Sequence, residues 1–178
     1  MKWSLSTVIG AAALALGLSS GAQAALSNFS FSGTFSQDDN VQLFNFTSDG
    51  VGTAYIVSYG YAGGTQANGT TWAQGGFDTI LTLFDSTGAL INSNDDGSSG
   101  CFSAAAGVAP GTVNGNSDSN TGSLYDTCFA ASLLAGTYTV AVTQYDNFAA
   151  GSNLSDGFQQ DGTGNFTAGF DSCTQGRF

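Results

Sequence analysis

Residues 77–85, FDTILTLFD, carry the clearest strand signal in this chain of 178 residues. Apolar and β-branched side chains of this kind fit the pleated surface of a sheet. The next three residues, STG at 86–88, predict a short hairpin loop, because glycine suits the left-handed position of such a loop. Residues 89–92 then return as the partner strand. This hairpin indicates antiparallel β-structure.

Strand signals recur at short intervals along the rest of the chain. Further strands are predicted at residues 29–35, 41–47, 53–59, 125–132, 137–145 and 165–170. Most of them alternate between apolar and small or polar residues, which is typical of a half-buried strand. A glycine-rich loop (60–76) and two long polar loops (93–123 and 146–164) separate them. About eight short strands predict an all-β fold, an antiparallel β-sandwich whose core comes largely from the 14 Phe.

The first 24 residues differ from the rest. Lys2 precedes an apolar run at residues 8–18, and the triplet AQA at 22–24 has the small-x-small form of a cleavage site. This order predicts a secretory signal peptide, residues 1–24, because the run is shorter than the ~20 apolar residues that span a membrane. Residues 25–178 then form one exported domain without a membrane span, located outside the cell, at its surface or in the periplasm.

The chain is strongly acidic, with a formal net charge of −11. All 13 acidic residues are Asp, Lys2 and Arg177 are the only basic residues, and His is absent. Contacts to phosphate groups need Lys and Arg, so nucleic acids and anionic membrane surfaces are excluded as partners. The charge balance favours cations or a cationic partner.

Most catalytic sets are excluded by composition. Without His there is no Ser-His-Asp or Cys-His pair, and residues 25–178 contain no Lys for a Ser-Lys pair. Zinc sites built on His or on four Cys are missing, as is a phosphate-binding P-loop. Paired aspartates hydrolyse glycosides only when one lies in an apolar pocket, and the adjacent Asp pairs here lie in polar turns. We therefore expect no enzymatic activity.

Three cysteines remain: Cys101, Cys128 and Cys173. In an exported protein two of them are expected to pair. Cys101 and Cys128 enclose a loop rich in Gly, Ser and Asn, where a crosslink removes the most chain entropy. This pair is the predicted disulfide, with Cys173 left over. The alternative is three free thiols.

The stretch INSNDDGSSG, residues 91–100, raises the question of a bound cation, because no basic side chain lies near its two Asp. Calcium takes about 6–8 oxygen ligands, among them carboxylates. The stretch resembles the front half of an EF-hand loop, but Ser103 stands in place of the bidentate Glu and no flanking helices are predicted. A calcium site that joins several loop ends fits better. Its candidate ligands lie at strand boundaries: Asp78, Asp95, Asp96, Asp126 and Asp146.

Turns in water are the competing interpretation of these aspartates. Asp and Asn are frequent in turns because their side chains bond nearby backbone groups. Against this, many uncompensated carboxylates would repel one another in a compact fold, and bound calcium would relieve the repulsion. Both interpretations stay open from the sequence.

Three aromatic residues in or beside the glycine-rich loop, Tyr59, Tyr61 and Trp72, have Asn and Gln nearby. Exposed rings of this kind bind sugars by stacking, which suggests a carbohydrate-binding site. The alternative is that they cap the end of the sandwich and keep only their polar tips in water.

Three stretches together resemble a known family: FDTILTLFDSTGALINSNDDG (77–97), LLAGTYTVAVTQYDNF (133–148) and LSDGF (154–158). In this order they are similar to secreted bacterial proteins with a pre-peptidase C-terminal (PPC)-like β-sandwich. The similarity is greatest to a family of unknown function often found with PEP-CTERM sorting tails, and it covers about residues 29–170. The resemblance implies a jelly-roll-like accessory module rather than a catalyst, and some PPC domains bind calcium.

The chain departs from that family at its end. It stops at CTQGRF, residues 173–178, where relatives continue into another strand, and it has no Pro-Glu-Pro motif. This predicts a domain truncated at its C-terminus. The leading hypothesis is a secreted, non-enzymatic module of the extracellular matrix or cell surface, with an extracellular polysaccharide or a matrix protein as partner. A carbohydrate-binding module is the alternative.

Overall fold

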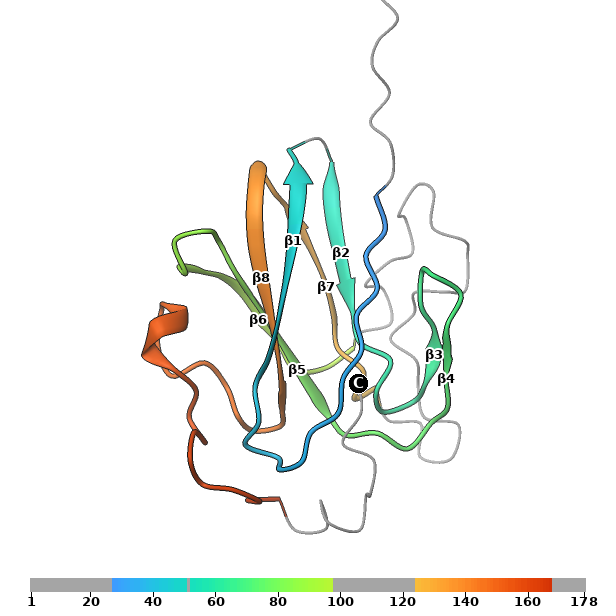
Figure 1. The fold of residues 1–178 in the computed structure, drawn as a ribbon, viewed down its shortest axis with the longest axis vertical. Helices are drawn as coiled ribbons and strands as arrows, with labels where there is room; N and C mark the ends of the chain where they lie inside the picture. The colour runs from blue at the N-terminus through green and yellow to red at the C-terminus, as the bar shows by residue number, and fades with distance from the viewer. Residues whose placement is uncertain (1–26, 51, 98–123, 168–178) are drawn as a thin grey trace, which may run out of the picture.

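The computed structural model describes residues 27–50, 52–97 and 124–167 (Figure 1). Its strands are β1 (Gln42–Asp49), β2 (Thr53–Val57), β3 (Gly64–Thr65), β4 (Thr71–Trp72), β5 (Thr79–Phe84), β6 (Leu90–Asn94), β7 (Cys128–Ser132) and β8 (Ala135–Gln144). One turn of 3-10 helix, Leu154–Asp156, follows, and these residues contain no α-helix. All strand pairs are antiparallel, so the predicted all-β class is confirmed.

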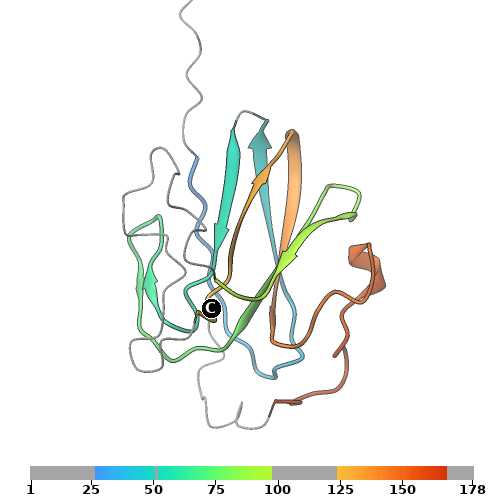
Figure 2. The ribbon, with the colours of Figure 1, turned by 180° about the vertical axis from the view of Figure 1, so that it is seen from behind.

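Two sheets face each other across the core (Figures 1 and 2). One sheet has four strands in the order β1-β8-β5-β6, and the other pairs β2 with β7. The buried side chains packed together between them are Phe35, Phe77, Leu81, Leu83, Phe129, Leu133, Tyr138, Val140 and Val142. Alternate residues of β5 and β8 supply most of this cluster, because successive side chains of a strand point to opposite faces.

The central strand β5 is buried on both faces. Leu81 and Leu83 face the second sheet, whereas Phe84 joins a second cluster with Ala141 and Phe158. Phe158 comes from residues 146–164, so this predicted polar loop in fact packs over the outer face of the four-stranded sheet. The hairpin that leads from β5 to β6 also follows the prediction, with Gly88 at φ +86°.

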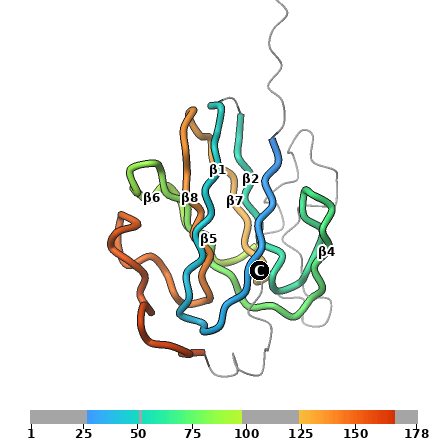
Figure 3. The backbone as a smooth tube through the Cα atoms, viewed as in Figure 1, coloured from blue at the N-terminus to red at the C-terminus, as the bar shows by residue number. Residues whose placement is uncertain are grey.

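The N-terminal segment differs from the prediction, because residues 29–35 do not form a strand. Phe29 lies against Phe46 with ring centroids 5.8 Å apart, and Phe31 lies against Phe44 at 4.8 Å. The alternation of Phe with small residues therefore reflects the packing of rings onto β1 rather than a hydrogen-bonded ladder. The segment runs beside β2 (Figure 3).

The glycine-rich loop and the last predicted strand also differ from the prediction. The glycine-rich loop contains the short hairpin of β3 and β4, which was not predicted. Residues 165–167, the start of the last predicted strand, are not a strand, and residues 168–170 lie outside the described ranges. The predicted signal peptide also lies outside them. Among the described residues, no helix has the length and apolar character needed to cross a membrane.

Candidate functional site

Backbone N–H groups compensate more than half of the aspartates in the described part of the chain. The 13 Asp less Asp118 and Asp171 leave 11, and no Lys, Arg or His accompanies them there. Six accept a backbone N–H: Asp38, Asp39, Asp85, Asp126, Asp156 and Asp161. Bonds of this kind stabilise a carboxylate without a cation. The need for a counter-ion is therefore smaller than the number of aspartates suggests.

Four of the five predicted ligands gather in one acidic cluster, which consists of Asp78, Asp95, Asp96 and Asp126. The negative charges of the other three all act on Asp78. Asp95 and Asp96 follow β6, Asp78 directly precedes β5, and Asp126 lies two residues before β7. Loop ends therefore place Asp95, Asp96 and Asp126 near enough for their charges to act on Asp78.

Backbone contacts hold the cluster at one end of the sandwich. The N–H of Gly97 donates to the carbonyl oxygen of Leu124 at 2.7 Å. The hydroxyl of Thr127 lies between the carbonyl oxygens of Asp95, at 2.7 Å, and Thr79. These contacts fasten the end of β6 to the starts of β5 and β7, which meet in Figures 1 and 2.

Asp126 is the buried member of the cluster, with a side chain that is 0% exposed. Its carboxylate accepts the backbone N–H groups of Tyr61 at 3.0 Å and Ala62 at 2.8 Å, and the hydroxyl of Ser58 at 3.1 Å. Burial raises the pKa of Asp126 to about 6, although these hydrogen bonds act in the opposite direction. Asp126 therefore fixes the turn that follows β2.

Asp78 is the least compensated member. Its Oδ1 atom is buried and has no hydrogen-bond partner among the described residues. Burial, and then the charges of Asp96, Asp95 and Asp126, together raise the pKa of Asp78 to about 7. Burial and then the charge of Asp95 also raise the pKa of Asp96. A cation bound at this position would offset both effects. It would replace the hydration that the carboxylates lose on burial, and it would reduce the repulsion between them.

The donor chemistry of the cluster fits a hard cation, but its present geometry does not form a finished metal site. Carboxylate and carbonyl oxygens are the ligands that calcium prefers. Among the described residues, no group of three or more His, Cys, Asp or Glu is placed to hold a metal ion. Binding calcium would therefore require the exposed Asp96 or its neighbours to move.

Asp146, the fifth predicted ligand, is set apart from the cluster. Its Oδ1 accepts a hydrogen bond from Nε2 of Gln160 at 3.1 Å. The N–H of the preceding Tyr145 donates to the carbonyl oxygen of Asp78 at 2.9 Å, so the two backbones are adjacent. The Asp146 charge is nevertheless not among those that act on Asp78.

Cys128 is buried at the start of β7 and is disulfide-bonded. Cys101 and Cys173 both lie outside the described residues, so the pairing of Cys128 with Cys101 stays a prediction.

The predicted aromatic residues do not form one exposed platform. Tyr59 is only 7% exposed, and burial followed by the charge of Asp126 raises the pKa of its hydroxyl. Trp72 is half-buried, and its indole N–H finds no partner among the described residues. Tyr61 instead packs edge-to-face on Tyr125, with centroids 4.9 Å apart and planes at 78°. Sequence reasoning missed Tyr125, whose position directly before Asp126 was the available signal.

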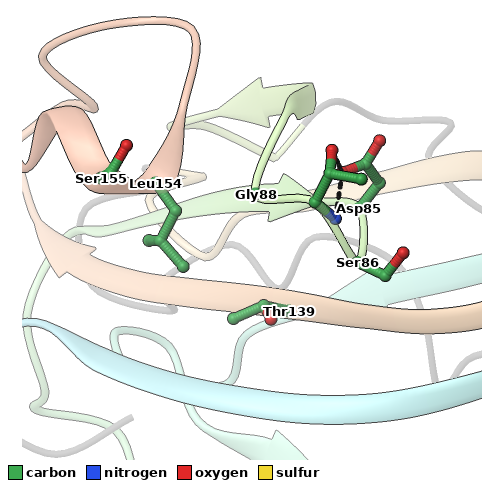
Figure 4. Close-up of a pocket in the computed structure, with 7 residues that line it drawn as sticks. Asp85, Ser86, Gly88, Thr139, Leu154 and Ser155 are labelled. Carbon is green, nitrogen blue, oxygen red and sulfur yellow. Dashed lines mark hydrogen bonds between the residues drawn. The ribbon is translucent and has the colours of Figure 1, made fainter.

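A shallow hollow of about 410 Å³ lies on the outer face of the four-stranded sheet (Figure 4). It is lined by Asp85, Ser86, Thr87, Gly88, Thr139, Leu154 and Ser155. The Asp85 carboxylate accepts the Thr87 hydroxyl at 2.6 Å and the Ala89 N–H at 2.9 Å. These bonds, the hydroxyl first, lower the pKa of Asp85. The Asp85 carboxylate is thus engaged in hydrogen bonds within the hairpin turn. We therefore do not treat the hollow as a second candidate site.

Comparisons with protein-family models, curated proteins and solved structures find no match to this chain.

Proposed function

We propose that this protein is a secreted, non-enzymatic β-sandwich module of the extracellular matrix or cell surface, stabilised by calcium at the acidic cluster. The observation that carries the calcium part is Asp78: one of its carboxylate oxygens is buried and receives no hydrogen bond from the described residues, and three like charges act on it. A buried charge without a partner destabilises the fold, so the binding of an external cation at this position is favourable.

Calcium would stabilise the fold by joining strand ends. Asp78 precedes β5, while Asp95 and Asp96 follow β6. Their side chains, completed by carbonyl oxygens and water, are the ligand types that calcium uses. An ion held by both segments binds the folded chain better than the unfolded chain, and by mass action it raises the stability.

The polar groups near the cluster support a structural rather than a catalytic role. The hydroxyls of Ser58 and Thr79 lie 2.5 Å apart, and Ser58 also donates to Asp126. Each of these groups is satisfied within the protein, and the chain has no His. An accessory module of the PPC-like kind is the family assignment that we propose with this function.

A calcium titration tests the proposal. Calcium at about 100 times its dissociation constant would add about 2.7 kcal/mol of unfolding free energy. For a domain of this size that corresponds to a melting temperature about 5–10 °C higher. Magnesium should stabilise the protein less, because it prefers a strict six-ligand geometry and keeps its waters.

Three controls separate binding from screening. Sodium chloride at matched ionic strength measures the relief of charge repulsion alone. The double variant Asp95→Asn, Asp96→Asn should lose the calcium-specific gain. Asp146→Asn removes one charge outside the cluster and should keep the gain. No stabilisation beyond the sodium chloride control would overturn the calcium part.

A carbohydrate-binding module is the second candidate, favoured by the Tyr61–Tyr125 pair. Tyr125 keeps 38% of its surface exposed, whereas the buried Tyr59 cannot present its ring to a ligand. Screening the protein on an array of extracellular polysaccharides tests this candidate, and the absence of any retained glycan would end it.

A further inference from the structure

We propose that Tyr61 and Tyr125, at the rim of the acidic cluster, bind a sugar unit that carries a free ammonium group, as in a polysaccharide of unacetylated amino sugars. The inference rests on the proposed function in one respect, that the protein works outside the cell among polysaccharides. It does not require bound calcium.

The tyrosine pair is a shaped aromatic surface. The two rings lie at 78° with centroids 4.9 Å apart, so the edge of one ring meets the face of the other. Tyr125 is 38% exposed, which leaves part of its ring open to a ligand. The face of an aromatic ring carries negative charge density and attracts ammonium groups. The pair therefore offers both a stacking surface for a sugar ring and attraction for its amine.

The backbone around the pair is fixed before any ligand arrives. The N–H of Tyr61 donates to Asp126 at 3.0 Å, and the carbonyl oxygen of Tyr61 accepts the N–H of Gly75 at 3.0 Å. The carbonyl oxygen of Tyr125 accepts the N–H of Thr79 at 3.3 Å. A surface held in this way loses little conformational entropy on binding.

Charge complementarity identifies the ligand as a cation. The backbone contact between Gly97 and Leu124 places the stretch with Asp95 and Asp96 beside Tyr125. Asp96 is exposed, so its carboxylate is accessible to a ligand beside the tyrosine pair. No Lys, Arg or His occurs among the described residues, so the positive charge has to come from outside. Charges of opposite sign across an interface also speed encounter and disfavour partners of like charge.

An amino sugar fits this surface better than a lysine side chain. A sugar ring presents a flat face of C–H groups that covers one aromatic ring while its amine reaches a neighbouring carboxylate. A lysine side chain loses the rotamer freedom of its flexible four-carbon stem on binding, a cost that a rigid sugar ring avoids. The Tyr61–Tyr125 pair offers two rings for stacking of this kind.

Isothermal titration calorimetry with a glucosamine hexamer tests the proposal, in EDTA and at low salt. The hexamer should bind, and its fully N-acetylated form should bind at least about tenfold more weakly, because acetylation removes the positive charge. Tyr125→Ala should weaken binding of the amine form about tenfold or more. Tyr55→Ala is the matched control, because Tyr55 is also 38% exposed but lies on β2. Melting curves confirm that both variants fold.

Three results would overturn the proposal. These are equal affinity for the two hexamers, no loss of affinity in Tyr125→Ala, and tighter binding of a lysine hexamer than of the glucosamine hexamer. The last result would identify a basic peptide as the partner. Because EDTA is present throughout, the outcome is separate from the calcium titration, and either proposal can fail while the other holds.

Discussion

Asp38 connects the far end of the described chain to the start of the sandwich. Removing its charge tests how much a hydrogen bond from a backbone N–H group to a buried carboxylate stabilises this fold. Its side chain is 0% exposed and lies just before β1. The two carboxylate oxygens accept the backbone N–H groups of Phe166 at 2.7 Å and Thr167 at 2.5 Å. The N–H of Asp38 in turn donates to Oδ1 of Asn165 at 3.1 Å.

Asp38→Asn keeps the shape of the side chain but changes one acceptor into a donor. One of the two N–H groups then faces an NH₂ group instead of an oxygen. Losing a hydrogen bond to a charged group costs about 1.5–3 kcal/mol. For a domain of this size we expect a melting temperature about 4–10 °C lower.

Thermal unfolding followed by circular dichroism measures this loss, at pH 7 in EDTA. Asp96→Asn is the charge-matched control, because Asp96 is exposed and its carboxylate receives no hydrogen bond from the described residues. We expect this control to stay within about 0.5 kcal/mol of the wild type or to gain slightly from reduced repulsion. If Asp38→Asn melts within about 1 °C of Asp96→Asn, which corresponds to less than about 0.5 kcal/mol, the reasoning is refuted.

Two other predictions concern the disulfide and the pH dependence. Peptide mapping by mass spectrometry without reduction should find Cys101 linked to Cys128. A Cys128–Cys173 link would contradict the pairing predicted from loop entropy. The pKa values of Asp78 and Asp126 are raised to about 7 and about 6 from an ordinary value of 3.8. The folded protein therefore binds protons that the unfolded chain has released, so in EDTA their contribution to stability is fully present below roughly pH 4 and is lost as the pH rises through roughly 6–7. The melting temperature should accordingly rise between roughly pH 8 and pH 5, and Asp78→Asn should flatten this slope; an unchanged slope would contradict the role of Asp78.

Local signals were sufficient for the strands at the centre of the fold. The strands predicted at residues 77–85 and 137–145 match β5 and β8 closely. A strand can be recognised from a few neighbouring residues, because its apolar side chains either alternate with polar ones or form a short apolar run. The turn between β5 and β6 was equally readable, since Gly88 supplies the backbone conformation that the turn needs.

Elements without a local signature were missed. Residues 29–35 alternate like a strand, but whether such a segment joins a sheet depends on a partner strand elsewhere in the chain. The outer face of β5 shows the same limit, because its cover comes from Phe158 on a segment that looked like a polar loop. The β3–β4 hairpin lies in a glycine-rich stretch with little side-chain pattern to detect.

The sequence by itself determined that this protein is an acidic all-β domain, and it named five aspartates near strand boundaries as candidate ligands: Asp78, Asp95, Asp96, Asp126 and Asp146. Only the tertiary structure decided which of these carboxylates already have partners. Asp126 receives its N–H donors from Tyr61 and Ala62, more than 60 residues earlier in the chain, whereas one oxygen of Asp78 receives none from the part of the chain that the structure describes. The physical reason is that a hydrogen bond needs its two atoms within about 3 Å, and that proximity is created by folding.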